Sequence, residues 1–228
     1  MDLESDIFCL GHVSVDIIIN RKTLTNLRSG GNINSQELTI YGGGDAANVS
    51  FWLGTLKTSV SLIGVIADDH SGHFLKKELR DANVRCRLKI SKQFPTAINL
   101  VIVESDGERS FIRNNEIQKE LKWEDIPFEA IEKSRLFYTS AYVIENSPVK
   151  NAINRLFRLI KRNVNSTTPM TMFNLASYTT VEKFKTDIRS NILPYTDILV
   201  GNKDEYSILA FNTQNGSYFD YFSIGNEI

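Results

Sequence analysis

Residues 41–56 read YGGGDAANVSFWLGTL and place three consecutive glycines directly before a helical pattern. Because glycine has no Cβ, the glycines at 42–44 permit a tight turn and a close approach to a ligand. We expect Asp45 to cap a helix that begins near Ala46, by accepting hydrogen bonds from its free N–H groups. Such a turn could hold a polar small molecule against main-chain N–H groups, and an ordinary surface turn would contain the same residues.

The helix after this turn carries large apolar residues at helical spacing. The pattern predicts that they form its buried face: Val49, Trp52, Leu53 and Leu56.

Strands and helices alternate along most of the chain. Short apolar runs predict strands at residues 7–10, 15–19, 60–63, 136–139, 170–174 and 198–200. A glycine-bounded loop at 64–72 leads into a helix whose Phe74, Leu75 and Leu79 are expected to face inward. Later helices are predicted at residues 149–162, 181–192 and 201–210. The alternation predicts an α/β fold with a mostly parallel sheet flanked by helices.

Two further segments predict a small second sheet. Residues 37–41 alternate toward a strand after a polar excursion, and 96–103 and 110–113 are β-rich runs joined by an Asp106-Gly107 turn. We expect residues 17–41 and 96–114 to pair as a small β-sheet lid inserted in one α/β domain of residues 1–228.

The composition is that of an ordinary globular protein, with a formal net charge of −1 and interspersed acidic and basic residues. This pattern argues against a nucleic-acid partner, and no apolar run is long enough to cross a membrane. The acidic N-terminus is unlike a secretory signal, and two cysteines, Cys9 and Cys86, are too few for a disulfide framework. We therefore expect a cytoplasmic protein.

His12, His70 and His73 make no metal-ligand pattern and are expected at the surface or in turns.

Four segments in this order resemble the ribokinase/PfkB family of carbohydrate and nucleoside kinases. They are GHVSVD at residues 11–16, GGDAAN at 43–48, GVIADDHSG at 64–72 and DILVGNKDE at 197–205. Each is weak alone, and together they span nearly the whole chain; the third has Ala67 where glycine is common in the family. The resemblance implies a ribokinase-like fold, in which the small sheet acts as a lid and sometimes as a homodimer interface.

The resemblance also implies which residues bind the substrate. Asp16 would accept hydrogen bonds from hydroxyl groups of a sugar or nucleoside. The glycine amides at Gly43 and Gly44, with the side chain of Asn48, would contact the same molecule. Taken without the family, Asp16 would more simply be a turn aspartate that bonds its own backbone.

A second part of the implied site belongs to the cofactors ATP and Mg²⁺. In the family the Asn-x-x-Glu element, here Asn202 and Glu205, helps to place the phosphates and the metal, which Glu205 would hold through water. Without the resemblance, Glu205 would be a first-turn acid stabilised by the helix dipole. Residues 191–205 and the pair Gly11-His12 resemble the nucleoside-kinase branch, which favours a nucleoside, with ribose or another sugar next.

The most consequential departure from the family is that no Gly-Ala-Gly-Asp motif occurs in the 228 residues. The aspartate that precedes an asparagine in many members is also missing, since Met172-Phe173-Asn174-Leu175 stands there. In the family the Gly-Ala-Gly-Asp motif forms an anion hole after the Asn-x-x-Glu element and is accompanied by the catalytic base. We therefore expect the base beyond residue 228 and a fold that is incomplete at the C-terminus. The implied activity is ATP-dependent phosphorylation of a sugar or nucleoside hydroxyl. The alternatives are a non-catalytic sugar- or nucleoside-binding protein and an inactive truncated product.

Overall fold

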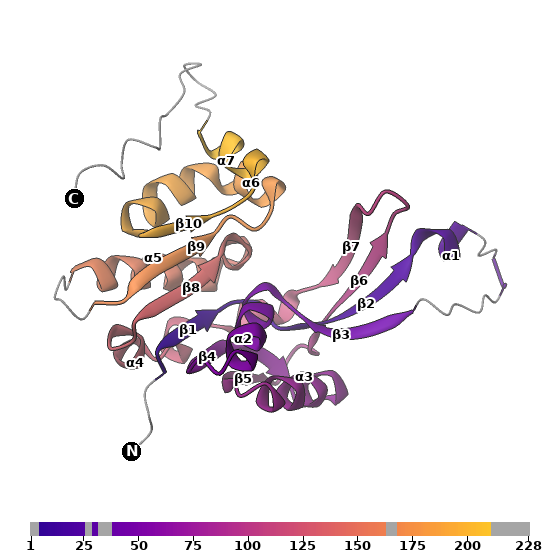
Figure 1. The fold of residues 1–228 in the computed structure, drawn as a ribbon, viewed down its shortest axis with the longest axis horizontal. Helices are drawn as coiled ribbons and strands as arrows, with labels where there is room; N and C mark the ends of the chain where they lie inside the picture. The colour runs from indigo at the N-terminus through magenta and orange to yellow at the C-terminus, as the bar shows by residue number, and fades with distance from the viewer. Residues whose placement is uncertain (1–4, 26–28, 32–37, 163–167, 211–228) are drawn as a thin grey trace.

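A computed structural model of the chain describes residues 5–25, 29–31, 38–162 and 168–210 (Figure 1). Its centre is a six-stranded sheet, called the main sheet here, in which every described strand pair is parallel. The strand order is β10 (Ile198–Val200), β9 (Met170–Asn174), β8 (Leu136–Ser140), β1 (Ile7–Leu10), β4 (Val60–Ala67) and β5 (Arg85–Ser91). The predicted α/β fold with a mostly parallel sheet is confirmed.

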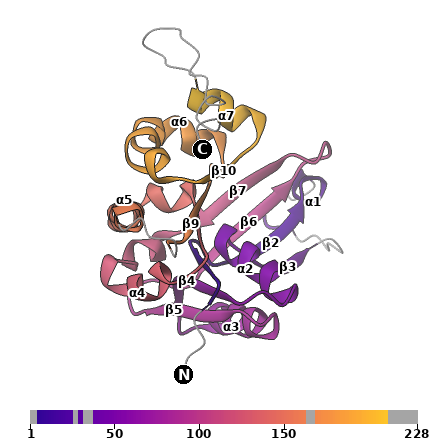
Figure 2. The same ribbon diagram turned by 60° about the vertical axis from the view of Figure 1, so that its left-hand side comes forward.

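Helices cover both faces of the main sheet, which explains why its central strands are continuous apolar runs. On β1, Phe8 and Leu10 point into one core and Cys9 into the other. Figure 2 shows α4 and α5 on one side of the sheet and α2 and α3 on the other. The helices and short helical turns are α1 (Arg21–Thr25), α2 (Asp45–Thr55), α3 (His70–Asp81), η1 (Glu116–Glu120), η2 (Trp123–Asp125), α4 (Phe128–Glu132), η3 (Ala141–Glu145), α5 (Ser147–Arg162), α6 (Tyr178–Asp187), η4 (Ile188–Ile192), η5 (Leu193–Tyr195) and α7 (Lys203–Ala210).

The predicted buried face of α2 is wrong. Trp52 and Leu56 are 64% and 74% exposed, whereas the buried residues of this helix are small: Ala46, Ala47, Ser50 and Gly54. The reason is how closely the helix approaches its neighbours, because a Cβ on Gly54 would lie 2.1 Å from the carbonyl oxygen of Ala82. Small side chains permit this approach, and Val49 and Leu53 are left only partly buried at the margin.

Two details around β4 also differ from the sequence prediction. The strand continues through Ala67, so the predicted loop at 64–72 begins too early; residues 64–67 pair with β5 and are buried. In α3, Leu75 and Leu79 are buried as expected, but Phe74 is 40% exposed. The helix itself begins at His70, earlier than the apolar pattern indicated.

The predicted second sheet is present. Its order is β3 (Thr39–Gly43), β2 (Ser14–Asn20), β6 (Ala97–Val103) and β7 (Arg109–Asn114), with β2 and β6 parallel and the outer pairs antiparallel. We call it the lid sheet. It projects away from the main sheet in Figure 1, and Figure 2 shows the same separation.

No helix among the described residues is long and apolar enough to cross a bilayer.

One carboxylate ties the lid sheet to the main sheet. Asp69 is the N-cap of α3 and accepts from the Gly72 N–H at 2.8 Å. It also accepts from the N–H and hydroxyl of Thr96, at 2.9 and 2.7 Å, and Thr96 is the residue before β6. Burial would raise the pKa of Asp69, but the hydrogen bonds from Thr96 and Gly72 outweigh it and hold the pKa below its usual value.

We therefore expect Asp69→Ala to destabilise the chain, since the helix cap is lost and the Thr96 N–H is left without its acceptor. The two losses together cost about 2–4 kcal/mol in the free energy of unfolding, measured from urea denaturation midpoints. The control is Asp68→Ala, which removes the neighbouring carboxylate; that side chain is 79% exposed and lies 3.0 Å from the exposed His73. Equal shifts of the midpoint for both variants would contradict the role of Asp69.

Candidate functional site

The strand order of the main sheet places a topological switch point at the carboxyl end of β1. The chain continues from β1 to β4 on one side and later returns to β8 on the other, so the connections diverge at this point. Ligands of open α/β sheets commonly bind at such a switch point. Gly11 and His12 follow β1 here, and the chain then enters the lid sheet.

The lid sheet and the glycine turn meet at Asp16. Oδ1 of Asp16 accepts from the Asn99 amide at 2.8 Å and from the Ser14 hydroxyl at 3.2 Å. A Cβ on Gly43 would lie 2.3 Å from the Asp16 carboxylate, so only glycine permits this contact. Gly44 has φ of +96°, and a Cβ there would lie 2.3 Å from the carbonyl oxygen of His12. The structure thus brings Asp16, Gly43 and Gly44 together, and their role in substrate binding stays a prediction.

Asn48 lies one helical turn further along α2. Its backbone N–H donates to the Gly44 carbonyl at 2.9 Å, and its side chain is exposed. The side chain therefore stands at the surface of the glycine turn, where its role in substrate binding stays a prediction.

The predicted capping role of Asp45 is wrong. Gly44 is the N-cap, because its φ of +96° is not helical and α2 therefore begins at Asp45. No side chain makes a capping hydrogen bond there. Oδ1 of Asp45 instead accepts from the His12 N–H at 3.3 Å. The other oxygen, Oδ2, is buried and has no hydrogen-bond partner in the described part of the chain.

His12 is buried, contrary to the prediction of a surface or turn position. Its side chain is covered by Tyr142 of η3, whose ring stacks on the imidazole with centroids 5.9 Å apart. Burial lowers the pKa of His12, so the ring is neutral at pH 7. Among the described residues nothing hydrogen-bonds its Nε2 atom. A buried acceptor or donor of this kind is suited to a polar ligand.

Sequence reasoning missed three side chains of this site. Asn99 and Arg113 follow from strand register, since Asp16 pairs with Asn99 and Asn99 with Arg113 across the lid sheet. The alternation of the predicted hairpin strands could have revealed them. Tyr142 had no such signal, because it enters the site through a short helical turn after β8.

Asn202 and Glu205 form a reciprocal cap at the start of α7. The Glu205 N–H donates to the Asn202 side chain at 2.9 Å, and both oxygens of Glu205 accept from Asn202, at 2.9 and 3.2 Å. This is the geometry of a capping box, with asparagine at the N-cap. Glu205 is 5% exposed. The pair follows β10, three strand spacings or about 14 Å from β1, so the structure does not bring it together with Asp16.

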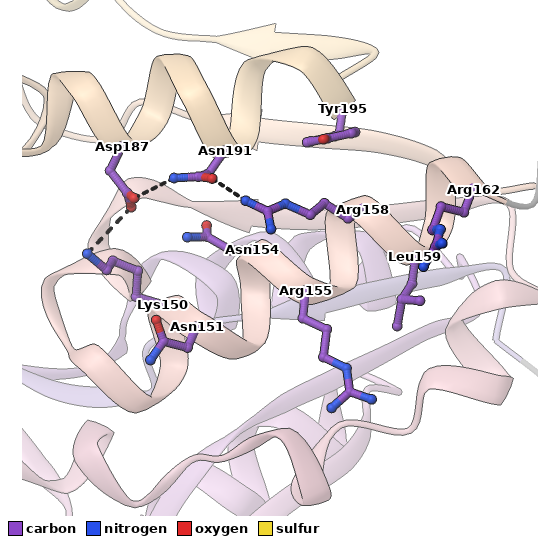
Figure 3. A pocket seen from close by; sticks show the side chains of 10 residues that line it. All are labelled: Lys150, Asn151, Asn154, Arg155, Arg158, Leu159, Arg162, Asp187, Asn191 and Tyr195. Carbon is purple, nitrogen blue, oxygen red and sulfur yellow. Dashed lines mark hydrogen bonds and ion pairs between the residues drawn. The ribbon is translucent and has the colours of Figure 1, made fainter.

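A separate open groove of about 820 Å³ lies along α5 (Figure 3). Asp187 accepts from Asn191 at 2.8 Å and lies 3.7 Å from the Lys150 ammonium, and Asn191 in turn accepts from Arg158. These contacts fasten α5 to α6 and η4. Its lining residues include none of those described above around the carboxyl end of β1, so we assign it to helix packing.

Comparison with known proteins finds relatives that are named as sugar kinases. A 5-dehydro-2-deoxygluconokinase of Halalkalibacterium halodurans is 26% identical over 180 residues, covering 77% of this chain and 54% of the relative. An ATP-dependent ribose-1-phosphate kinase of Halopiger xanaduensis is 31% identical over 117 residues, covering 51% of this chain and 39% of the relative. The chain thus spans about half or less of the length of these relatives.

Solved structures support the fold. Adenosine kinase from Sinorhizobium meliloti superposes with a TM-score of 0.76 at 23% identity, covering 91% of this chain and 68% of that one. The family model described as pfkB family carbohydrate kinase matches residues 4–218. The predicted resemblance is confirmed: this chain belongs to the pfkB family of carbohydrate kinases.

Proposed function

We propose that this chain binds a sugar or nucleoside beside the carboxyl end of β1, as the substrate-binding part of an enzyme that phosphorylates a hydroxyl group of that molecule with ATP. The observation that carries the proposal is the setting of Asp16. In the described part of the chain, Ser14 and Asn99 both donate to Oδ1, which leaves Oδ2 for a substrate hydroxyl. The half-buried carboxylate is held by the lid sheet and by Gly43, so it is positioned before a ligand arrives.

The names of the relatives support a small hydroxylated substrate. Two curated relatives are named as a 5-dehydro-2-deoxygluconokinase and a ribose-1-phosphate kinase, and structural neighbours include adenosine kinases. Phosphoryl transfer to an alcohol requires a positioned acceptor, a base for its proton and charge stabilisation of the moving group. Asp16, Gly43, Gly44 and Asn48 are proposed for the first requirement. We propose that the base and the anion hole lie outside residues 1–228.

Glu205 and Asn202 are proposed to face the ATP phosphates and Mg²⁺. Mg²⁺ takes oxygen ligands and usually retains several waters. Both Glu205 oxygens already accept from Asn202, which fits contact with the ion through water. Within the described residues there is no group of three or more His, Cys, Asp or Glu that could hold a metal. The ion would therefore be bound largely by the phosphates, and it would neutralise their charge.

We expect Asp16→Asn to weaken substrate binding by about 1–3 kcal/mol, because the neutral amide gives up a charged hydrogen bond. Calorimetric titration of the chain with adenosine, ribose and gluconate measures this without requiring turnover. Asp106→Asn, an exposed change in the lid hairpin turn, serves as the control. An unchanged affinity in Asp16→Asn for every ligand that the wild type binds would refute the proposed site.

The second proposed experiment tests chemistry and metal together. If the chain is catalytic, it transfers phosphate from ATP, and Glu205→Gln lowers turnover about 10- to 100-fold and raises the Mg²⁺ concentration required. Glutamine keeps one acceptor for the Asn202 N–H and loses the bond from the Asn202 amide, so the melting temperature should fall only slightly. Unaltered metal dependence would remove Glu205 from the metal site. Saturable binding with no transfer would favour the alternative, a non-catalytic sugar- or nucleoside-binding protein.

We also propose a homodimer through the lid sheet. The face opposite Asp16 carries a cross-strand row of apolar residues, Ile40, Ile17, Leu100 and Ile112, whose outer members are more than half exposed. An exposed apolar row of this kind suits a self-complementary interface.

Ile112→Lys should convert a dimer to a monomer, because it would bury an unpaired charge in that interface. The native mass in sedimentation equilibrium measures the change. Phe111→Lys places the same charge on the opposite face of β7 and should leave the dimer intact. A wild-type chain that is monomeric at high concentration would rule the interface out.

A further inference from the structure

Several buried polar atoms without partners belong to residues around the carboxyl end of β1. In the described part of the chain they include Nε2 of His12, Oδ2 of Asp45 and Oδ1 of Asn99. His12 is only 7% exposed, so its unpartnered nitrogen is not simply hydrated at the surface. Buried polar groups normally have hydrogen-bond partners, and these atoms therefore point to a polar ligand.

The lid sheet adds a positive charge to the same side. Asp16, Asn99 and Arg113 are direct neighbours across β2, β6 and β7, so they form one row on one face. A carboxylate, an amide and a guanidinium thus lie side by side. The row comes from segments that are far apart in the sequence, which the parallel pairing of β2 with β6 unites.

Arg113 is held by aromatic rings and not by an acid. Its guanidinium carbon lies 5.1 Å from the ring centre of Tyr142 and 5.1 Å from that of Phe111. Tyr142 in turn stacks on His12, so the guanidinium continues a stack that begins at the buried imidazole. Among the described residues no carboxylate lies within ion-pair distance of Arg113. One guanidinium N–H is hydrogen-bonded to the Tyr142 hydroxyl, and a guanidinium has five N–H donors, so others can reach a ligand.

A guanidinium presents a planar fork of donors that matches a carboxylate or phosphate. We propose that Arg113 makes this site selective for substrates that carry an acidic group, a carboxylate or a phosphate, in addition to the hydroxyls bound by Asp16. Tyr142 is the platform that orients the guanidinium. The inference rests on the proposed substrate site and specifies its substrate class: an acidic sugar is preferred over a neutral sugar or nucleoside.

The test is calorimetric titration of the 228-residue chain with matched pairs of probes. Ribose 1-phosphate is compared with ribose, and gluconate with glucose; adenosine is the neutral nucleoside. We expect at least one acidic probe to bind about 10- to 100-fold more tightly than its neutral counterpart. The pair that shows this preference distinguishes a phosphate from a carboxylate.

Variants then assign the preference to one residue. Arg113→Gln should abolish this preference, because it lowers the affinity for acidic probes far more than the affinity for neutral ones. Arg113→Lys should retain part of the preference, because an ammonium keeps the charge but lacks the planar fork. Arg109→Gln is the matched control, since it removes the same charge from the same exposed strand and should preserve the preference. Arg113 is exposed, so its variants should melt as the wild type does.

Three results would overturn the inference. They are equal binding of acidic and neutral probes by the wild type, a preference that survives in Arg113→Gln, and a loss of preference in Arg109→Gln as large as in Arg113→Gln. In each of these the chain still binds sugars, so the proposed site stands. Absence of binding to every probe would reject the proposed site and the inference together. Where the chain does bind neutral probes, weaker binding by Asp16→Asn shows that they occupy the proposed site, so only the inference about Arg113 fails.

Discussion

The contact between the Asp16 carboxylate and the backbone of Gly43 determines how the two sheets of this protein meet. Asp16 lies on β2 and Gly43 ends the neighbouring strand β3, and no side chain at position 43 would fit against the carboxylate. The next residue, Gly44, turns the chain into α2, which packs on the main sheet. The carboxylate that is proposed to bind substrate therefore lies at the joint from which the lid sheet extends.

Much of this architecture could be predicted from local pattern, because parallel strands buried on both faces have continuous apolar sequences. The strand bounds at Ile7–Leu10, Met170–Asn174 and Ile198–Val200 agree with the sequence prediction. The face of α2 could not be predicted from hydrophobicity, since close approach to Ala82 selects small residues there and leaves Trp52 exposed. Hydropathy measures the gain from burial, not the space available for it.

The residues of the candidate site also differ in how well local sequence pattern could predict them. Short motifs of glycines and acids identified Asp16, Gly43 and Gly44 as candidates. Glycine is required where φ is positive or where another group approaches the backbone closely, so such positions can be recognised from residue type. His12 was misassigned because its burial depends on Tyr142, a residue 130 positions away that reaches it only in the folded chain. Glu205 illustrates a third situation, in which one side chain completes a helix cap and is also proposed to face the cofactors. For such a residue, sequence pattern alone does not separate a structural role from a functional one.

The parallel pairing of β2 with β6 has a consequence for how the protein folds. Asp16 and Asn99 are 83 positions apart in the chain, and β4, α3 and β5 lie between them. Closing so long a loop carries an entropic cost that local contacts do not compensate. The strands β1, β4 and β5 with their helices can assemble first and bring the two lid segments close together. The lid sheet would then be the late-forming part of the molecule, and the proposed substrate site would be completed only when the rest of this half has folded.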